Sequence, residues 1–261
     1  MKNARWFLVL AGAVAALLAA LAGADTKPPA DYGRVIISNF SAKGGVAPVV
    51  FDHWLHRAKY TCRLCHVDIG FGLKANATGI TAADNSKGVY CGACHNGKTV
   101  MDGKKIFAAC GPDKADKRCE RCHSQGKSVK PEKDFAAFAA RLPKDTFGNG
   151  INWEKAAEDG QIKLSDHLEG VSIKQPAQSI QKDFTIQPKA GQKGEILFSH
   201  KKHVLWNGCE VCHPEVFKGG KRGVQQYSME EIKQKKFCGV CHGTVAFPID
   251  DCARCHAKPV K

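Results

Sequence analysis

The chain has 261 residues, with 39 lysines and arginines against 25 aspartates and glutamates, 13 cysteines, and a formal net charge of +14. The basic residues are scattered rather than gathered in a stripe and no nucleic-acid-binding fold is signalled, which argues against a nucleic-acid-binding protein. Beyond the first 24 residues, no apolar stretch is long enough to span a bilayer.

Residues 1–24 have the pattern of a secretory signal peptide. Lys2 and Arg5 form a positive n-region, residues 6–21 are apolar or small, and residues 22–24 form a small-x-small cleavage site. An uncleaved anchor is the alternative, but the run is short and no basic stop-transfer flank follows it. We therefore expect a mature chain in the periplasm, or exported further to the outer surface or the medium.

A lead of residues 25–45, with a short strand at Arg34–Ile37, precedes six copies of the pattern Cys-x-x-Cys-His. This pattern is the attachment signature of a c-type haem, because two thiols form thioethers with the porphyrin and the adjacent imidazole reaches the iron. Zinc knuckles and thioredoxin-like pairs need no histidine directly after the second cysteine, and the fixed spacing argues against a disulfide framework. The predicted attachment cysteines are Cys62, Cys65, Cys91, Cys94, Cys119, Cys122, Cys209, Cys212, Cys238, Cys241, Cys252 and Cys255, and the proximal ligands are His66, His95, His123, His213, His242 and His256.

Six covalently attached haems would leave about 40 residues of mature chain for each, too few for an ordinary core beside them. We therefore expect the macrocycles to be much of the core. The predicted fold is a mainly α-helical or irregular small multihaem fold with short helices, long turns and almost no sheet. The haem propionates would balance most of the positive charge; a basic patch for an acidic partner is the second interpretation.

The chain contains an internal duplication. The pattern Phe-x-His-x-x-His stands before the first motif, at Phe51–His56, and before the fourth, at Phe198–His203, offset by 147 residues. The third motif of each copy is offset by only 133 residues, so the first copy carries a 14-residue insertion before Cys119. Such a repeat predicts two units of the same build, at residues 46–124 and 195–261, each with three haems.

The segment between the copies, residues 125–194, is predicted to be a partly helical linker that packs on a haem unit. A helix opens at Pro131, with an apolar stripe up to Leu142, and Pro143 stops it. Asn152 caps a second helix over residues 153–158. Pro176 and Pro188 mark extended chain.

Four further histidines are candidate distal ligands. Asp52 and Ser199 are good N-cap residues, so each Phe-x-His-x-x-His pattern places its two histidines three residues apart on one helix. Residues at i and i+3 lie side by side, and two such rings cannot serve one iron. We expect His53 and His56, and likewise His200 and His203, to reach two different haems.

The Phe-x-His-x-x-His pattern followed by three motifs, of which the middle one reads Cys91-Gly92-Ala93-Cys94-His95 or Cys238-Gly239-Val240-Cys241-His242, resembles the triheme cytochrome c7 domains of the cytochrome c3 superfamily. The resemblance covers residues 46–124 and 195–257. It implies an electron-transfer cytochrome of anaerobic or extracellular respiration. The implied partners are quinol-oxidising membrane complexes, terminal reductases and outer-membrane cytochromes.

The resemblance also implies distal ligands. It pairs His53 with the His66 haem, His56 with the His95 haem, His200 with the His213 haem and His203 with the His242 haem. The family places a third distal ligand before the middle motif, where Ser228–Glu231 reads as a capping box. Met229 is therefore predicted for the His256 haem, with a purely packing methionine as the alternative. In the first copy Ala82 stands at that position, and alanine cannot bind iron.

The His123 haem must then take His167, Met101 or no distal ligand, and we favour His167. The unpaired Cys110 is interpreted as a buried or idle thiol, with iron ligation or an intermolecular disulfide as lesser alternatives. Six fully ligated irons predict an electron carrier rather than an enzyme. A five-coordinate His123 haem would instead predict an oxidoreductase with an open site for nitrite, hydroxylamine or peroxide.

Overall fold

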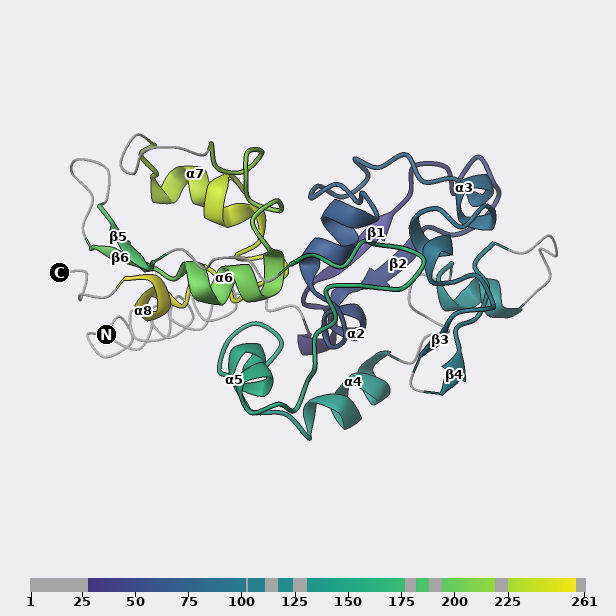
Figure 1. The fold of residues 1–261 in the computed structure, drawn as a ribbon, viewed down its shortest axis with the longest axis horizontal. Coiled ribbons are helices and arrows are strands. Elements are labelled where there is room, and N and C mark those ends of the chain that lie inside the picture. Colours follow the sequence, from purple (N-terminus) through teal and green to yellow (C-terminus); the bar gives the residue numbers. More distant parts are fainter. Residues whose placement is uncertain are drawn as a thin grey trace, which may run out of the picture.

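The fold is known from a computed structural model whose described residues are 28–101, 103–110, 117–123, 131–176, 182–187, 194–218 and 225–256. The predicted signal peptide and Pro188 lie outside these residues. The chain forms two lobes that lie side by side, with helices α4 (Pro131–Ala139) and α5 (Trp153–Glu158) below their junction (Figure 1). No helix in the described segments has the length and apolarity needed to cross a membrane.

The first lobe begins with an antiparallel strand pair in which Arg34 lies opposite Asp52 and Ile37 lies opposite Val49. The first of these strands occupies the predicted residues Arg34–Ile37. After the pair come only short helical turns and a two-residue hairpin. The elements are β1 (Arg34–Ile37), β2 (Val49–Asp52), α2 (His53–Arg57), a π-helical turn (Leu64–Asp68), α3 (Ala82–Ser86), a 3₁₀ turn (Tyr90–Ala93), β3 (Val100–Met101), β4 (Lys104–Lys105) and a 3₁₀ turn (Lys117–Arg121).

The second lobe repeats this order from the end of the linker onward. Its strand pair lies at β5 and β6, so part of the predicted linker belongs to this lobe as a strand. The part of the linker that was predicted to be extended therefore contains a strand, because residues 184–186 pair with residues 196–198. The elements are β5 (Phe184–Ile186), β6 (Ile196–Phe198), α6 (His200–Asn207), α7 (Met229–Lys233), a 3₁₀ turn (Phe237–Val240) and α8 (Cys252–Cys255).

Helices α3 and α7 begin in the same way in both lobes. The Ser228 hydroxyl accepts a hydrogen bond from the backbone N–H of Glu231, and the Ser228 backbone N–H donates one to the Glu231 carboxylate, which confirms the predicted capping box. Thr81 and Asp84 form the equivalent box in the first lobe. At α6 the Ser199 side chain caps the helix as predicted. Asp52 stands at the N-cap position of α2 as predicted, but its carboxylate accepts hydrogen bonds from Arg34 at 2.7 and 3.2 Å and makes no cap hydrogen bond.

The one substantial apolar core among the described residues lies where α4 and α5 pack on α2. Trp54 of α2 contacts Phe135 and Phe138 with ring centroids 5.1 and 5.2 Å apart, and Trp153 and Ile151 are buried beside them. Asn152 caps α5 by accepting a hydrogen bond from Lys155, as predicted. Helix α4 ends at Ala139, earlier than the predicted stripe to Leu142. The linker therefore packs on the first lobe, and little conventional core exists elsewhere in the described segments.

Candidate haem-binding sites

A single cavity of about 3320 Å³ runs through both lobes. It is several times larger than the roughly 300–1,000 Å³ of an ordinary small-ligand site. Its walls carry all the predicted attachment cysteines except Cys119 and Cys209. A cavity of this size, lined by repeated thiols and imidazoles in a chain with little apolar core, fits several large apolar cofactors that complete the interior.

Each attachment motif forms a helical turn, which brings its two thiols and its imidazole to one side. The backbone N–H of His95 donates to the carbonyl of Cys91 at 2.8 Å, and His242 donates to Cys238 at 2.9 Å. The third, fourth and sixth motifs make the same bond at 2.8, 3.0 and 2.9 Å. One porphyrin edge can thus meet both cysteines while the adjacent histidine faces its centre.

The imidazoles of these motifs are oriented by backbone carbonyls. The Nδ1 atoms of His66, His123, His213 and His242 lie 2.8, 2.7, 2.8 and 3.0 Å from carbonyl oxygens. An imidazole that donates from Nδ1 keeps the lone pair on Nε2, which is how metal-binding histidines are normally held. The residues present therefore suit iron ligation through Nε2.

The second histidine of each Phe-x-His-x-x-His pattern faces the middle motif of its own lobe. The ring centroids of His56 and His95 are 6.3 Å apart, and those of His203 and His242 are 6.2 Å apart. Two imidazoles that bind one metal from opposite sides through bonds of about 2.0 Å, each nitrogen about 1.1 Å from its ring centroid, stand about 6.2 Å apart. The spacing in both lobes leaves room for one iron between the rings.

The two lobes hold these candidate distal histidines in the same way. The His53 ring meets Phe51 edge-on at 4.8 Å, and the His200 ring meets Phe198 edge-on at 4.9 Å. Burial, the largest cause, lowers the pKa of His53 and of His56 to about 4. Both imidazoles are then neutral at physiological pH, which is the form that can bind a metal. The proximity of His66 also lowers the pKa of His53, by less than burial does.

The candidate distal ligands of the His123 and His256 haems lie outside the Phe-x-His-x-x-His patterns. Met229 and His256 both line the cavity. The ligation of the His123 haem by His167 stays a prediction. The chain next to His167 is held beside the first motif, where the backbone N–H of Thr61 donates to the carbonyl of Ser165 at 3.0 Å. Met101 accepts a hydrogen bond from the hydroxyl of Tyr60 at 3.3 Å.

Cys110 lies beside α3 and close to His123. A hydrogen bond with His123 lowers the pKa of the Cys110 thiol, and Asn85 contributes a second one. The side-chain amide of Asn85 donates to the Cys110 sulfur at 3.5 Å. No sequence pattern indicates this pairing, because His123 follows Cys110 by 13 positions and the insertion has no counterpart in the second copy.

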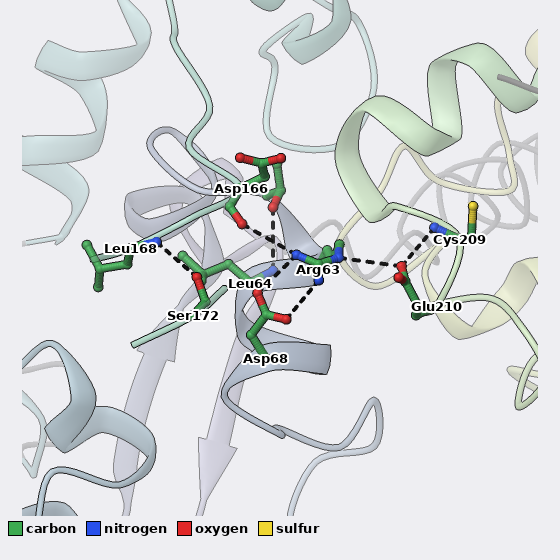
Figure 2. A network of polar contacts seen from close by, with 9 residues as sticks. Arg63, Leu64, Asp68, Asp166, Leu168, Ser172, Cys209 and Glu210 are labelled. Atoms are coloured by element: carbon green, nitrogen blue, oxygen red, sulfur yellow. Dashed lines mark hydrogen bonds and ion pairs between the residues drawn. The ribbon is translucent and has the colours of Figure 1, made fainter. Parts of the chain in front are cut away.

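A polar network joins the first motif of one lobe to the first motif of the other (Figure 2). Arg63 is 4% exposed and donates to both carboxylate oxygens of Asp68, at 2.9 and 3.0 Å. Its Nε also lies 3.4 Å from the carboxylate of Glu210, inside the fourth motif. A Cβ on Gly208 would lie 2.6 Å from the Arg63 side chain, so a glycine with φ of +61° is required for this approach.

Arg57 forms a second link at the junction. Its guanidinium lies 4.4 Å from the ring centroid of Trp153 and 5.1 Å from that of Trp206, and it donates to the carbonyl of Val245 at 2.6 Å. Sequence reasoning missed this residue, because its partners are far away in the chain. The link joins α2 of the first lobe to the linker and the second lobe.

The family model for cytochrome c7 and related cytochrome c matches residues 49–128 and 196–257, and the chain belongs to this family. It is a multihaem c-type cytochrome, and its six Cys-x-x-Cys-His motifs indicate six haems. The resemblance and the fold class predicted from the sequence are thereby confirmed: the fold is irregular, with short helices and little sheet.

Three solved structures are similar to this chain. The C-terminal hexahaem fragment of GSU1996 is 28% identical, over 88% of this chain and 98% of that one, with a TM-score of 0.27. The dodecahaem cytochrome c GSU1996 is 27% identical, over 90% and 50%, with a TM-score of 0.26. The N-terminal hexahaem fragment is 25% identical, over 87% and 99%, with a TM-score of 0.26. No curated protein matches the chain.

Proposed function

We propose that this protein is an electron carrier, periplasmic or exported, that passes electrons between redox partner proteins in anaerobic or extracellular respiration. The observation that carries the proposal is the order of the six motifs in space. The third motif neighbours the second and the second neighbours the first; the first adjoins both the fourth and the fifth, and the sixth lies beside the fifth. Bound haem supplies a one-electron iron couple at each step of the path that these neighbours form.

In the first lobe, the three motifs are neighbours in reverse sequence order. Burial, and after it the nearby Cys122 of the third motif, raises the pKa of Cys91 in the second motif to about 11. Cys65 of the first motif is similarly close to Cys94, and burial with this neighbour raises the pKa of Cys65 to about 12. The backbone N–H of Val50 donates to the carbonyl of Cys122 at 2.9 Å, which holds the third motif against β2.

At the junction, the first motif meets the second lobe directly. Burial, and after it the nearby Cys62, raises the pKa of Cys212 in the fourth motif to about 11 and that of Cys241 in the fifth motif to about 12. The Arg63–Glu210 contact of 3.4 Å ties the same two motifs together. The attachment points of the two lobes are therefore neighbours, as a continuous path requires.

In the second lobe, the path continues outward. Cys238 of the fifth motif interacts with Cys255 of the sixth, and also with Cys212 of the fourth. The sixth motif forms α8, in the lobe opposite to the hairpin β3–β4 that precedes the third motif (Figure 1). Partner proteins can thus reach the two ends of the path from different sides of the molecule. The predicted signal peptide supports an exported carrier.

The test is whether the reduced protein gives its electrons to proteins or to small molecules. The fully reduced protein is mixed in separate runs with an oxidised small c-type cytochrome, nitrite, hydroxylamine and peroxide, and reoxidation is followed by absorption. We expect rapid reoxidation by the cytochrome and no sustained turnover of the small molecules. Sustained turnover of any of the three would overturn the carrier in favour of an oxidoreductase with an open haem site.

A further inference from the structure

The guanidinium of Arg57 is held in place but keeps hydrogen-bond donors for a further partner. It packs against two indole rings, 4.4 Å from the centroid of Trp153 and 5.1 Å from that of Trp206. Within the described part of the chain its hydrogen bond goes to the carbonyl of Val245, at 2.6 Å. A guanidinium has further N–H donors. Because Arg57 lines the large cavity, these donors can reach a group bound there.

This cation lies where three attachment motifs meet. Arg57 ends α2, five residues before the first motif. Trp206, against which it packs, stands three residues before the fourth motif. The backbone N–H of Val245 donates to the carbonyl of Cys241 at 2.9 Å, so the acceptor of the Arg57 hydrogen bond is itself bonded to the fifth motif.

No acidic residue of the described segments pairs with this guanidinium, and none is among the charges that shift its pKa. Burial lowers the pKa of Arg57, while Cys62, Tyr32 and Cys241 oppose that shift. Both thiols become neutral thioethers when haem is attached. Burial also raises the pKa of Tyr32 to about 12, so its hydroxyl is neutral at physiological pH. An arginine stays charged under these conditions, and its charge is left without a protein anion.

Arg63, the other arginine of the junction, is different. Its guanidinium donates to both carboxylate oxygens of Asp68, at 2.9 and 3.0 Å, and lies 3.4 Å from the carboxylate of Glu210. The protein itself therefore compensates the charge of Arg63. Arg57 is the junction cation that still needs an anion, because a charge in an interior filled by cofactors is costly unless it is paired.

We propose that Arg57 binds a propionate of a junction haem, that is, a haem attached to the first, fourth or fifth motif. Propionates are carboxylates, and the planar guanidinium fork suits a carboxylate. The haem side chains are also the anions that bind into this cavity together with the cofactor. The cavity, the three motifs and the uncompensated cation are thus parts of one site.

The bound cation has a consequence for electron transfer. A fixed positive charge beside a haem stabilises its reduced form and so raises its potential. Arg57 therefore makes one junction haem easier to reduce than it would be without the guanidinium, at the place where electrons cross between the lobes. This inference extends the proposed carrier function, but the binding of the propionate requires only that the haems are attached.

The experiment is a redox titration of the full-length mature protein with all its haems, followed by nuclear magnetic resonance so that the haems are resolved individually. We expect Arg57→Gln to lower the potential of one junction haem and to leave the haems of the third and sixth motifs unchanged. The haem that shifts is the one whose propionate is bound. Arg57→Lys keeps the charge and should restore that potential. Arg141→Gln, an exposed arginine away from the junction, should leave all the potentials as in the wild type.

Unchanged potentials in Arg57→Gln would overturn the proposal, and so would a shift confined to the third or sixth motif. Failure of Arg57→Lys to restore the potential would mean that Arg57 only holds the lobes together. If Arg57→Gln does not retain its haems, the infrared difference between reduced and oxidised wild type with isotope-labelled arginine decides. A guanidinium band that responds to reduction and is missing from Arg57→Lys is expected, and its absence from the wild type would refute the assignment. Small-molecule turnover by the wild type would refute the carrier function without altering these results, so the two failures are distinguishable.

Discussion

Replacing Arg57 by alanine should loosen the junction between the two lobes. The side chain joins α2 to the linker through Trp153 and to the second lobe through Trp206 and Val245. Because these partners come from three separate parts of the chain, no neighbouring residue can replace the interactions of the guanidinium. The variant therefore reports on how firmly α2 is held to the linker and to the second lobe.

The magnitude follows from the interactions that an alanine side chain cannot make. A hydrogen bond from a charged donor contributes about 1.5–3 kcal/mol. Each cation–π contact adds about 0.5–1 kcal/mol at a partly exposed site. Rehydration of the neighbouring carbonyl offsets part of the sum, which leaves a free-energy loss of about 3 kcal/mol. For a chain of this size that corresponds to a fall in Tm of about 6–12 °C.

The assay is thermal unfolding of the haem-loaded protein, followed by far-ultraviolet circular dichroism. Arg141→Ala is the matched control, because its guanidinium is exposed and lies 6.0 Å from the Phe138 ring, away from the junction. We expect the control to change Tm by less than about 2 °C. An equally small change for Arg57→Ala would refute the assigned role of this residue.

Three other changes have defined outcomes. In Gly239→Ala the new Cβ would lie 1.9 Å from the carbonyl oxygen of Ile232, so the yield of six-haem protein, measured by intact mass, should fall sharply. Gly79→Ala is the control and should be neutral, because the nearest atom to its new Cβ is 3.9 Å away. Met229→His should lower the potential of one haem by on the order of 100 mV in a redox titration, and an unchanged titration would mean that Met229 only packs. Chemical removal of the haems should abolish roughly half or more of the circular dichroism signal, because so little apolar core is left, and a native-like spectrum would contradict a haem-built interior.

Features set by a few neighbouring residues were predictable from the sequence. The capping box at Ser228, the cap at Asn152 and the strand Arg34–Ile37 all occur as predicted. Asp52 had the right residue type for a cap, but Arg34 of the paired strand takes its carboxylate. The strand β5 was hidden in apparent linker, because its strand character comes from pairing with β6 rather than from its own composition.

The same division holds for the candidate sites. Attachment motifs are local, and so the cysteines and proximal histidines could be named from spacing alone. The junction could not be predicted, because Arg57 and Val245 are 188 residues apart and neither belongs to a recognisable pattern. Cys110 was visible only as a spare thiol, and its contact with His123 depends on how the insertion folds back.

The most direct test of the continuous path is the rate at which electrons spread through the protein. Oxidised protein is mixed rapidly with less than one electron equivalent per molecule, and the absorption of the haems is followed until it stops changing. A path through all six motifs predicts that the electrons reach their final distribution over both lobes in one fast phase. Two separate phases, each confined to three haems, would contradict a path that crosses the junction.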